Sequence, residues 1–114
     1  MSSTRVERPW GWFVQFTHDE PSTVKLLYVR KGEETSLQYH THRQEFWKIV
    51  QGNPEITIGD VKHHPHPGEE FVVEPLIQHE IAAPVDDCVI LEISKGSFEE
   101  SDIVRISDKY NRAS

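Results

Sequence analysis

Residues 32–47, GEETSLQYHTHRQEFW, bring three candidate metal ligands close together in the chain. Gln38 and His40 are two positions apart, so on a β-strand both side chains point to the same side. Glu45 follows after a short turn and can return to that side from the neighbouring strand. One amide oxygen, one imidazole and one carboxylate then converge, and these groups make up most of a metal site. A fourth ligand is expected from farther along the chain, where His79 is the natural candidate.

This spacing resembles the first motif of the cupin family, which reads Gly, five residues, His, one residue, His, four residues, Glu, six residues, Gly. Gly32 and Gly52 occupy the two Gly positions, and Gln38 stands where most cupins have the first His. With Gln at this position, the chain resembles the phosphomannose isomerases of this family, in which Gln, His, Glu and His hold the metal.

Further segments resemble the isomerase domain at the C-terminus of the bifunctional phosphomannose isomerase/mannose-1-phosphate guanylyltransferase enzymes. These segments are residues 8–11, 24–27, 36–40, His42, Arg43, Glu45, Trp47, Glu100, residues 102–105, Asp108, Tyr110 and Arg112. The resemblance runs from about residue 7 to residue 112. It implies one cupin domain over residues 1–114, with its core at about 7–112.

The second cupin motif reads Gly, five residues, Pro, one residue, Gly, two residues, His, three residues, Asn. Gly68 and His79 keep the overall separation of that motif, but Pro75 comes one residue late. Residues 77–78 occupy the region where the family usually turns on Gly, and Ala83 stands where the family often has Asn. The turn before His79 is therefore expected to be built differently.

Short strand patterns recur along the chain, and no segment of a dozen residues has a helical period. Residues 45–50 and 55–58, separated by the turn signal Gly52-Asn53-Pro54, are interpreted as a hairpin. Residues 61–67 are expected to form an exposed loop, and residues 99–106 are ambiguous between a helical turn and a strand. Other strands are predicted at residues 12–16, 24–29, 71–73, 80–82 and 88–93. The pattern indicates an all-β sandwich or barrel, and the resemblance selects the cupin double-stranded β-helix, a jelly-roll barrel.

The composition limits the classes of function. The chain has 114 residues, enough for one domain, so no guanylyltransferase activity is expected of it. Its net charge of −7 argues against nucleic acid as a partner. Cys88 is the only cysteine, which excludes an intrachain disulfide. No signal peptide or run of about 20 apolar residues is seen, so a soluble cytoplasmic protein without a membrane partner is expected.

The four expected ligands, Gln38, His40, Glu45 and His79, suit one divalent ion of Zn, Mn, Co, Fe or Ni without choosing among them. They carry one negative charge, so the bound ion stays net positive and can polarise a carbonyl or stabilise an enediolate. The resemblance implies a metal-dependent sugar-phosphate isomerase that converts mannose 6-phosphate to fructose 6-phosphate through an enediol. That reaction needs a cation, a base and a cationic pocket for phosphate.

Several other residues are candidates for this chemistry. Arg43 matches the Arg of the family's His-Arg-x-Glu segment, and the resemblance implies that it stabilises negative charge on the substrate or the transition state. His42 is a candidate for proton transfer, because imidazole suits that role, or it orients a ligand. Trp47 shares a strand face with Glu45 and is expected to line the cavity. Lys25, Arg105 and Arg112 are candidates for phosphate binding, with Ser36 as a hydroxyl donor; surface salt bridging is the alternative.

Two alternative functions are compatible with the same residues. One is another cupin isomerase acting on a different sugar, or an Fe²⁺ oxygenase, although oxygenases more often carry three His and one Glu. The other is a non-catalytic metal- or sugar-binding module.

Phe46 replaces a His common in the relatives, which is expected to alter the surroundings of the ligands. A homodimer through N-terminal strands is expected, with Trp10, Trp12 and Phe16 in core or dimer packing.

Overall fold

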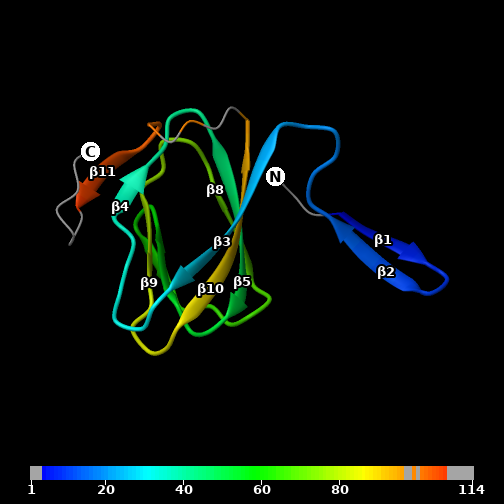
Figure 1. Ribbon diagram of the computed structural model, residues 1–114, viewed down its shortest axis with the longest axis horizontal. Helices are drawn as coiled ribbons and strands as arrows, with labels where there is room; N and C mark the ends of the chain where they lie inside the picture. The colour runs from blue at the N-terminus through cyan, green and yellow to red at the C-terminus, as the bar shows by residue number, and fades with distance from the viewer. Residues whose placement is uncertain (1–3, 97–98, 100, 108–114) are drawn as a thin grey trace.

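The computed structural model describes residues 4–96, 99 and 101–107, and these residues form strands and connecting turns without a helix (Figure 1). In this part of the chain, no helix is long and apolar enough to span a membrane. The strands are β1 (Thr4–Arg8), β2 (Gly11–Gln15), β3 (Ser22–Val29), β4 (Leu37–Tyr39), β5 (Gln44–Gln51), β6 (Glu55–Ile58), β7 (Val61–His63), β8 (Glu70–Val73), β9 (His79–Ala82), β10 (Cys88–Lys95) and β11 (Val104–Ser107).

Two antiparallel sheets face each other to make a barrel (Figure 1). One sheet has the strand order β3-β10-β5-β8, and the other has the order β11-β4-β9-β6-β7. Alternate side chains of each strand point into the space between the sheets. The core there consists of buried apolar residues that include Trp47, Ile49, Ile56, Ile81 and Ile90. This architecture confirms the all-β double-stranded β-helix expected from the sequence.

The expected hairpin between residues 45–50 and 55–58 is wrong, because β5 and β6 belong to different sheets. β5 pairs with β10 and β8, whereas β6 pairs with β7 and β9. The turn between them crosses the barrel, and the Asp86 carboxylate holds it by accepting hydrogen bonds from Asn53 N at 2.8 Å and Asn53 Nδ2 at 2.9 Å. Gly52 is required in this turn, because its φ is +89° and a Cβ there would collide with the carbonyl oxygen of Asp87.

The structure also differs from the prediction for residues 61–67 and assigns part of residues 99–106 to a strand. The first three residues of the expected loop 61–67 form β7, which pairs with β6. His64 and His66 beyond it are exposed. The ambiguous tail contains a strand, β11, which pairs with β4 and so brings the C-terminal segment beside Gln38. The signal for β1 was not recognised, although β1 and β2 form a regular five-residue ladder.

The turn before His79 contains a leucine in the left-handed region of backbone space. Leu76, with φ of +71°, lies eight residues after Gly68, so this residue, and not residues 77–78, takes the place of the Gly in the second cupin motif. Its N–H donates a 2.7 Å hydrogen bond to the carbonyl oxygen of His40. The chain therefore keeps the turn geometry that this Gly provides, and does so with a side chain that this conformation disfavours.

Replacing Leu76 by Gly is expected to stabilise the protein. Relief of the left-handed conformation is worth about 1–2 kcal/mol, and the added chain freedom of Gly in the unfolded state offsets about half of it. Thermal unfolding of the metal-free protein should shift upward by a few degrees, about 5 °C at most. Leu76→Val is the control and should unfold at a lower temperature, since a β-branched residue tolerates positive φ poorly. A lower melting temperature for Leu76→Gly would contradict this account.

Candidate metal centre

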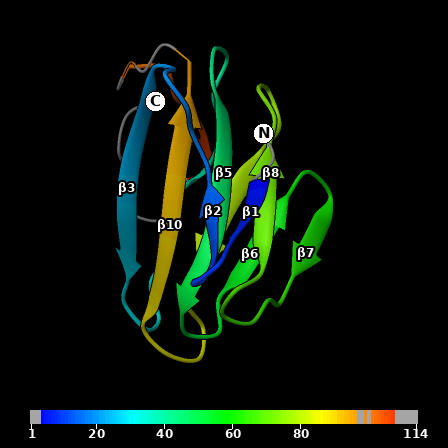
Figure 2. The ribbon, with the colours of Figure 1, turned by 90° about the vertical axis from the view of Figure 1, so that its right-hand side faces the viewer.

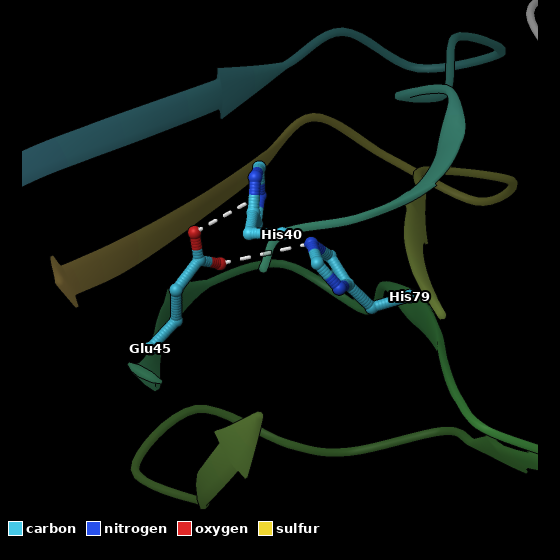
Figure 3. Close-up of side chains that lie close together, drawn as sticks. All are labelled: His40, Glu45 and His79. Atoms are coloured by element: carbon cyan, nitrogen blue, oxygen red, sulfur yellow. Dashed lines mark ion pairs between the residues drawn. The ribbon is translucent and has the colours of Figure 1, made fainter. Parts of the chain in front are cut away.

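Three buried side chains from both sheets converge inside the barrel (Figure 3). His40 follows β4, Glu45 lies on β5 and His79 begins β9. Their nitrogen and oxygen atoms all lie within 4.8 Å of one another. The sequence predicted that Glu45 lies on the strand next to that of Gln38 and His40, and this is wrong, because β4 and β5 belong to different sheets. The three side chains therefore meet across the interior of the barrel.

Backbone carbonyl groups fix the orientation of both imidazoles. His40 Nδ1 lies 2.5 Å from the carbonyl oxygen of Asp102, and His79 Nδ1 lies 3.0 Å from that of Ile77. A carbonyl only accepts hydrogen bonds, so each Nδ1 carries the proton and each Nε2 keeps a lone pair. Those lone pairs face Glu45, with His40 Nε2 at 3.3 Å from Oε2 and His79 Nε2 at 3.8 Å from Oε1.

A positive group already occupies part of this arrangement. The buried guanidinium of Arg43 contacts Glu45 Oε2 through Nε at 3.1 Å and His40 Nε2 through Nη2 at 3.0 Å. Glu45 Oε2 and His40 Nε2, two of the atoms that would bind a metal ion, therefore contact a cationic group, the Arg43 guanidinium, in this structure. Burial also lowers the pKa of His79, which favours the neutral imidazole that metals bind.

Gln38 lies beside this cluster and lines the same cavity as His40, Glu45 and His79. It stands directly opposite His79 in the ladder between β4 and β9, so the two side chains share the inner face of the sheet. Its amide nitrogen donates to the carbonyl oxygen of Ser36 at 3.4 Å, which leaves the amide oxygen as the available ligand atom. Two imidazoles, one carboxylate and one amide oxygen are a donor set that fits a divalent transition metal.

The cavity around the cluster has a volume of about 280 Å³. Trp47 lies on its wall and donates from Nε1 to Glu45 Oε1 at 3.1 Å, so both oxygens of that carboxylate are held. Lys25, Glu92 and Trp47 lie opposite one another across β3, β10 and β5, and all three line the cavity.

Glu92 is a buried residue that the sequence analysis missed. Burial and the neighbouring charge of Glu45 raise the pKa of Glu92 to about 8. Burial opposes ionisation of Glu45 too, but the hydrogen bond with Glu92 and the electrostatic interactions with His79, His40 and Arg43 outweigh it and lower the pKa of Glu45. The two carboxyl groups therefore hold one proton between them at neutral pH. The available signal was one acid inside the apolar run 88–93.

Two of the expected residues lie away from the cluster. The side chain of His42 is 77% exposed and contacts Thr41 Oγ1 and the Asp102 carboxylate, so the structure does not bring it into the cavity. Phe46 points to the outer face of its sheet and contacts Phe16, with ring centroids 5.1 Å apart and the ring planes tilted by 45°. The expectation that Phe46 alters the surroundings of the ligands is therefore wrong. Arg112 lies outside the described residues.

A second and larger cleft adjoins the cavity. Its volume is about 500 Å³, and Thr35 and Gln38 line both spaces. Arg105 lines the cleft and lies opposite Gln38 in the ladder between β11 and β4. The hydroxyl of Ser36, which also lines it, is buried and makes no hydrogen bond within the described part of the chain. Arg30 adds a further positive side chain to the lining.

The barrel has the cupin fold, a double-stranded β-helix. A cupin protein from Bacteroides fragilis superposes with a TM-score of 0.60 at 24% identity, covering 68% of this chain and 70% of that one. The family described as mannose-6-phosphate isomerase C-terminal matches residues 1–108, and the chain belongs to this family.

Bacterial relatives carry the same domain within longer chains. A mannose-1-phosphate guanylyltransferase of Escherichia coli K12 is 36% identical over 115 aligned positions, which cover 94% of this chain and 23% of that protein. The xanthan biosynthesis protein XanB of Xanthomonas campestris is 33% identical and is matched over 24% of its length. The chain thus spans about a quarter of the length of these relatives.

The carboxylate of Asp102 organises the turn that carries His40. It accepts hydrogen bonds from Thr41 Oγ1 at 2.6 Å, from Thr41 N at 2.9 Å and from His42 N at 3.0 Å. These bonds, with that of the Thr41 hydroxyl the strongest, lower the pKa of Asp102 to about 2. Its ordinary value is 3.8. The folded state is therefore stabilised above about pH 4, and this contribution is lost as the pH falls through about 2.

Asp102→Asn is expected to lower the melting temperature at pH 5–8, because an amide has one accepting oxygen for three donors. The deficit relative to the natural protein should shrink as the pH falls from about 4 towards 2. Asp60→Asn, in the turn between β6 and β7, is the matched control and should stay close to the natural protein throughout. A deficit for Asp102→Asn that stays constant down to pH 2 would show that ionisation of this carboxyl group does not contribute.

Proposed function

We propose that this chain is a metal-dependent sugar-phosphate isomerase domain that interconverts mannose 6-phosphate and fructose 6-phosphate through an enediol. The observation that carries the proposal is the buried cluster of His40, Glu45 and His79 beside a cleft that contains Arg105 and Ser36. Membership of the mannose-6-phosphate isomerase C-terminal family supports the same substrate class.

Gln38, His40, Glu45 and His79 would hold the metal ion. A divalent ion there would supply positive charge for the C1 oxygen, which goes from carbonyl to hydroxyl, and for the C2 oxygen, which goes from hydroxyl to carbonyl. Arg43, which contacts both Glu45 and His40, adds a second positive group at the same wall. Negative charge that develops on the enediolate oxygens would therefore meet fixed cationic groups in a partly enclosed space.

The adjoining cleft suits the phosphate group. Arg105 and Arg30 supply positive charge to it, and the buried Ser36 hydroxyl is available to donate. A sugar phosphate lying across Gln38 and Thr35 would reach both spaces, because these two residues line the cavity and the cleft alike. Local cations are needed here, since the chain as a whole carries a net charge of −7.

Glu92 and Lys25 are the groups that we propose for proton exchange with C1 and C2. Both line the cavity, and neither is among the four residues that would hold the metal. A carboxyl group within hydrogen-bond reach of a carbon-bound proton is the usual requirement for aldose–ketose isomerisation. His42 is not included, because its ring lies outside the cavity.

The second candidate function is a sugar-phosphate-binding module without turnover. This function is favoured by the length comparison, since the Escherichia coli relative is named as a guanylyltransferase and the matched part is about a quarter of that protein. Metal and ligand binding without conversion would distinguish this function from the first.

Removal of the metal is expected to abolish isomerisation, and Zn²⁺, Mn²⁺ or Co²⁺ added in turn should restore it. His40→Ala should lower both metal content and kcat/KM at least about 100-fold, because it removes a ligand of the ion. His64→Ala is the matched control, since this exposed histidine pairs with Glu55 away from the cavity. Conversion of mannose 6-phosphate is followed by coupled assay and metal content by elemental analysis. Protein that binds metal but converts none of the substrate with any ion would overturn the isomerase proposal.

Arg105→Gln and Ser36→Ala are each expected to raise KM for mannose 6-phosphate about 10-fold, because a hydrogen bond to a charged group is worth about 1.5–3 kcal/mol. Metal content should stay unchanged in both variants. Binding of unphosphorylated mannose should also be unaffected, which separates phosphate recognition from a general disturbance of the site. Lys62→Gln, on the exposed strand β7, is the control. Equal losses for mannose and mannose 6-phosphate would contradict the phosphate assignment.

A further inference from the structure

Arg43 contacts atoms that a metal ion would also need. The residue lies immediately before β5, an inner strand of the four-stranded sheet that faces the viewer in Figure 2. Its side chain is buried, and its guanidinium donates from Nε to Glu45 Oε2 at 3.1 Å and from Nη2 to His40 Nε2 at 3.0 Å. Glu45 and His40 are two of the three residues that converge in Figure 3.

These two contacts compete with ligation of an ion. The Nδ1 proton of His40 is held by the carbonyl oxygen of Asp102, so Nε2 has a single lone pair. That lone pair accepts the Arg43 N–H or binds an ion, but it cannot do both. Glu45 Oε2 has a second lone pair, yet the guanidinium beside it would repel any ion bound there.

The size of this effect follows from the behaviour of the simplest cation, the proton. An arginine next to a carboxylate typically lowers the pKa of that carboxylate by about 1–3, so the affinity for a proton falls about 10- to 1,000-fold. A divalent ion carries twice the charge of a proton, and the guanidinium repels it at least as strongly. Arg43 therefore weakens binding of an ion to Glu45 by a measurable factor.

The opposite side of the cluster offers the ion a place to enter. His79 Nε2 lies 3.8 Å from Oε1, the other oxygen of Glu45, and Gln38 lies opposite His79 in the ladder between β4 and β9. Arg43 Nη1 also donates to the carbonyl oxygen of Glu99 at 3.3 Å, a contact that involves none of the four expected ligands. The guanidinium can therefore turn away from the ligands and still be held at the cavity wall.

We propose that Arg43 is a built-in competitor of the metal ion, which keeps Glu45 and His40 in their ligating orientation until an ion displaces it. The buried carboxylate of Glu45 then has a cationic partner both before and after the ion binds. The affinity of the site is lower than the four ligands alone would give, because binding of the ion includes displacement of the guanidinium. This role depends on the metal site of the proposed function but not on turnover.

Titration of the metal-free protein with Co²⁺, followed by visible absorption, tests the proposal in the absence of substrate. Arg43→Gln should bind Co²⁺ at least about 10-fold more tightly than the natural protein. Without metal, this variant should melt at a lower temperature, because the buried carboxylate of Glu45 loses its ion pair. Arg43→Lys keeps the positive charge and should bind Co²⁺ more weakly than Arg43→Gln.

Lys48→Gln is the matched control for charge. It removes a positive side chain from the same strand, β5, where Lys48 pairs with Glu70 at 3.4 Å and does not line the cavity. Its affinity for Co²⁺ should equal that of the natural protein. Equal or weaker binding by Arg43→Gln would overturn the proposal and leave the isomerase proposal untouched. Absence of Co²⁺ binding in the natural protein and in every variant would overturn the metal site, and both proposals with it.

Chemical complementation tests the same contact in a variant that has room for the missing group. Guanidinium chloride at tens of millimolar, far below denaturing concentration, should raise the melting temperature of metal-free Arg43→Ala and weaken its Co²⁺ binding. An equal concentration of sodium chloride should do neither, and the natural protein should respond to neither salt. Co²⁺ binding to Arg43→Ala that guanidinium does not weaken would overturn the proposal.

Discussion

Burial of the Glu45 carboxylate is the constraint around which the inside of this barrel is organised. The residue is 1% exposed, and an unpaired carboxylate at such a place would cost several kcal/mol. Arg43 and Trp47 donate to its two oxygens, Glu92 shares a hydrogen bond with it, and the imidazoles of His40 and His79 lie beside it. These partners come from both sheets, so the stability of the polar centre and the closure of the barrel depend on each other. These groups stabilise the buried negative charge of Glu45, and a divalent cation would stabilise the same charge.

The orientation of the two histidines depends on backbone groups outside the sheets. Asp102, which precedes β11, accepts a hydrogen bond from His40 Nδ1 through its carbonyl oxygen, while its carboxylate holds the turn at Thr41. One residue therefore connects the C-terminal segment to a candidate metal ligand in two ways. β11 then continues into the pairing with β4, which sets Arg105 beside Gln38. The C-terminal patch is thus part of the wall between the metal cavity and the larger cleft.

Strand periodicity predicted an all-β sandwich or barrel, and the spacing of His40 and Glu45 predicted their convergence, because both are local properties. The resemblance to the cupin family selected the jelly-roll barrel and supported His79 as a further ligand. The sequence could not predict the sheet to which each strand belongs, and the turn at Gly52 was therefore interpreted as a hairpin although it crosses between sheets. Two further features depend on long-range packing and had little local signal. Leu76 takes a conformation typical of Gly because its N–H bonds to His40, and Glu92 keeps a proton because it is buried against Glu45. His42 was ranked by residue type alone, and only the structure reveals that its ring faces solvent.

The distribution of partner strands along the chain has a consequence for how the molecule folds. β3 pairs with β10, and β4 pairs with β9 and β11, so each of these ladders joins segments that are tens of residues apart. Chains dominated by such distant pairings close large loops before they gain contacts, and they fold in milliseconds to seconds rather than microseconds. The cluster of His40, Glu45 and His79 cannot exist until these ladders have formed, so the candidate metal site would form only at the end of folding. Until then, the strand edges and the apolar hairpin are exposed together, and the interval before closure is the period in which the chain is most prone to aggregate.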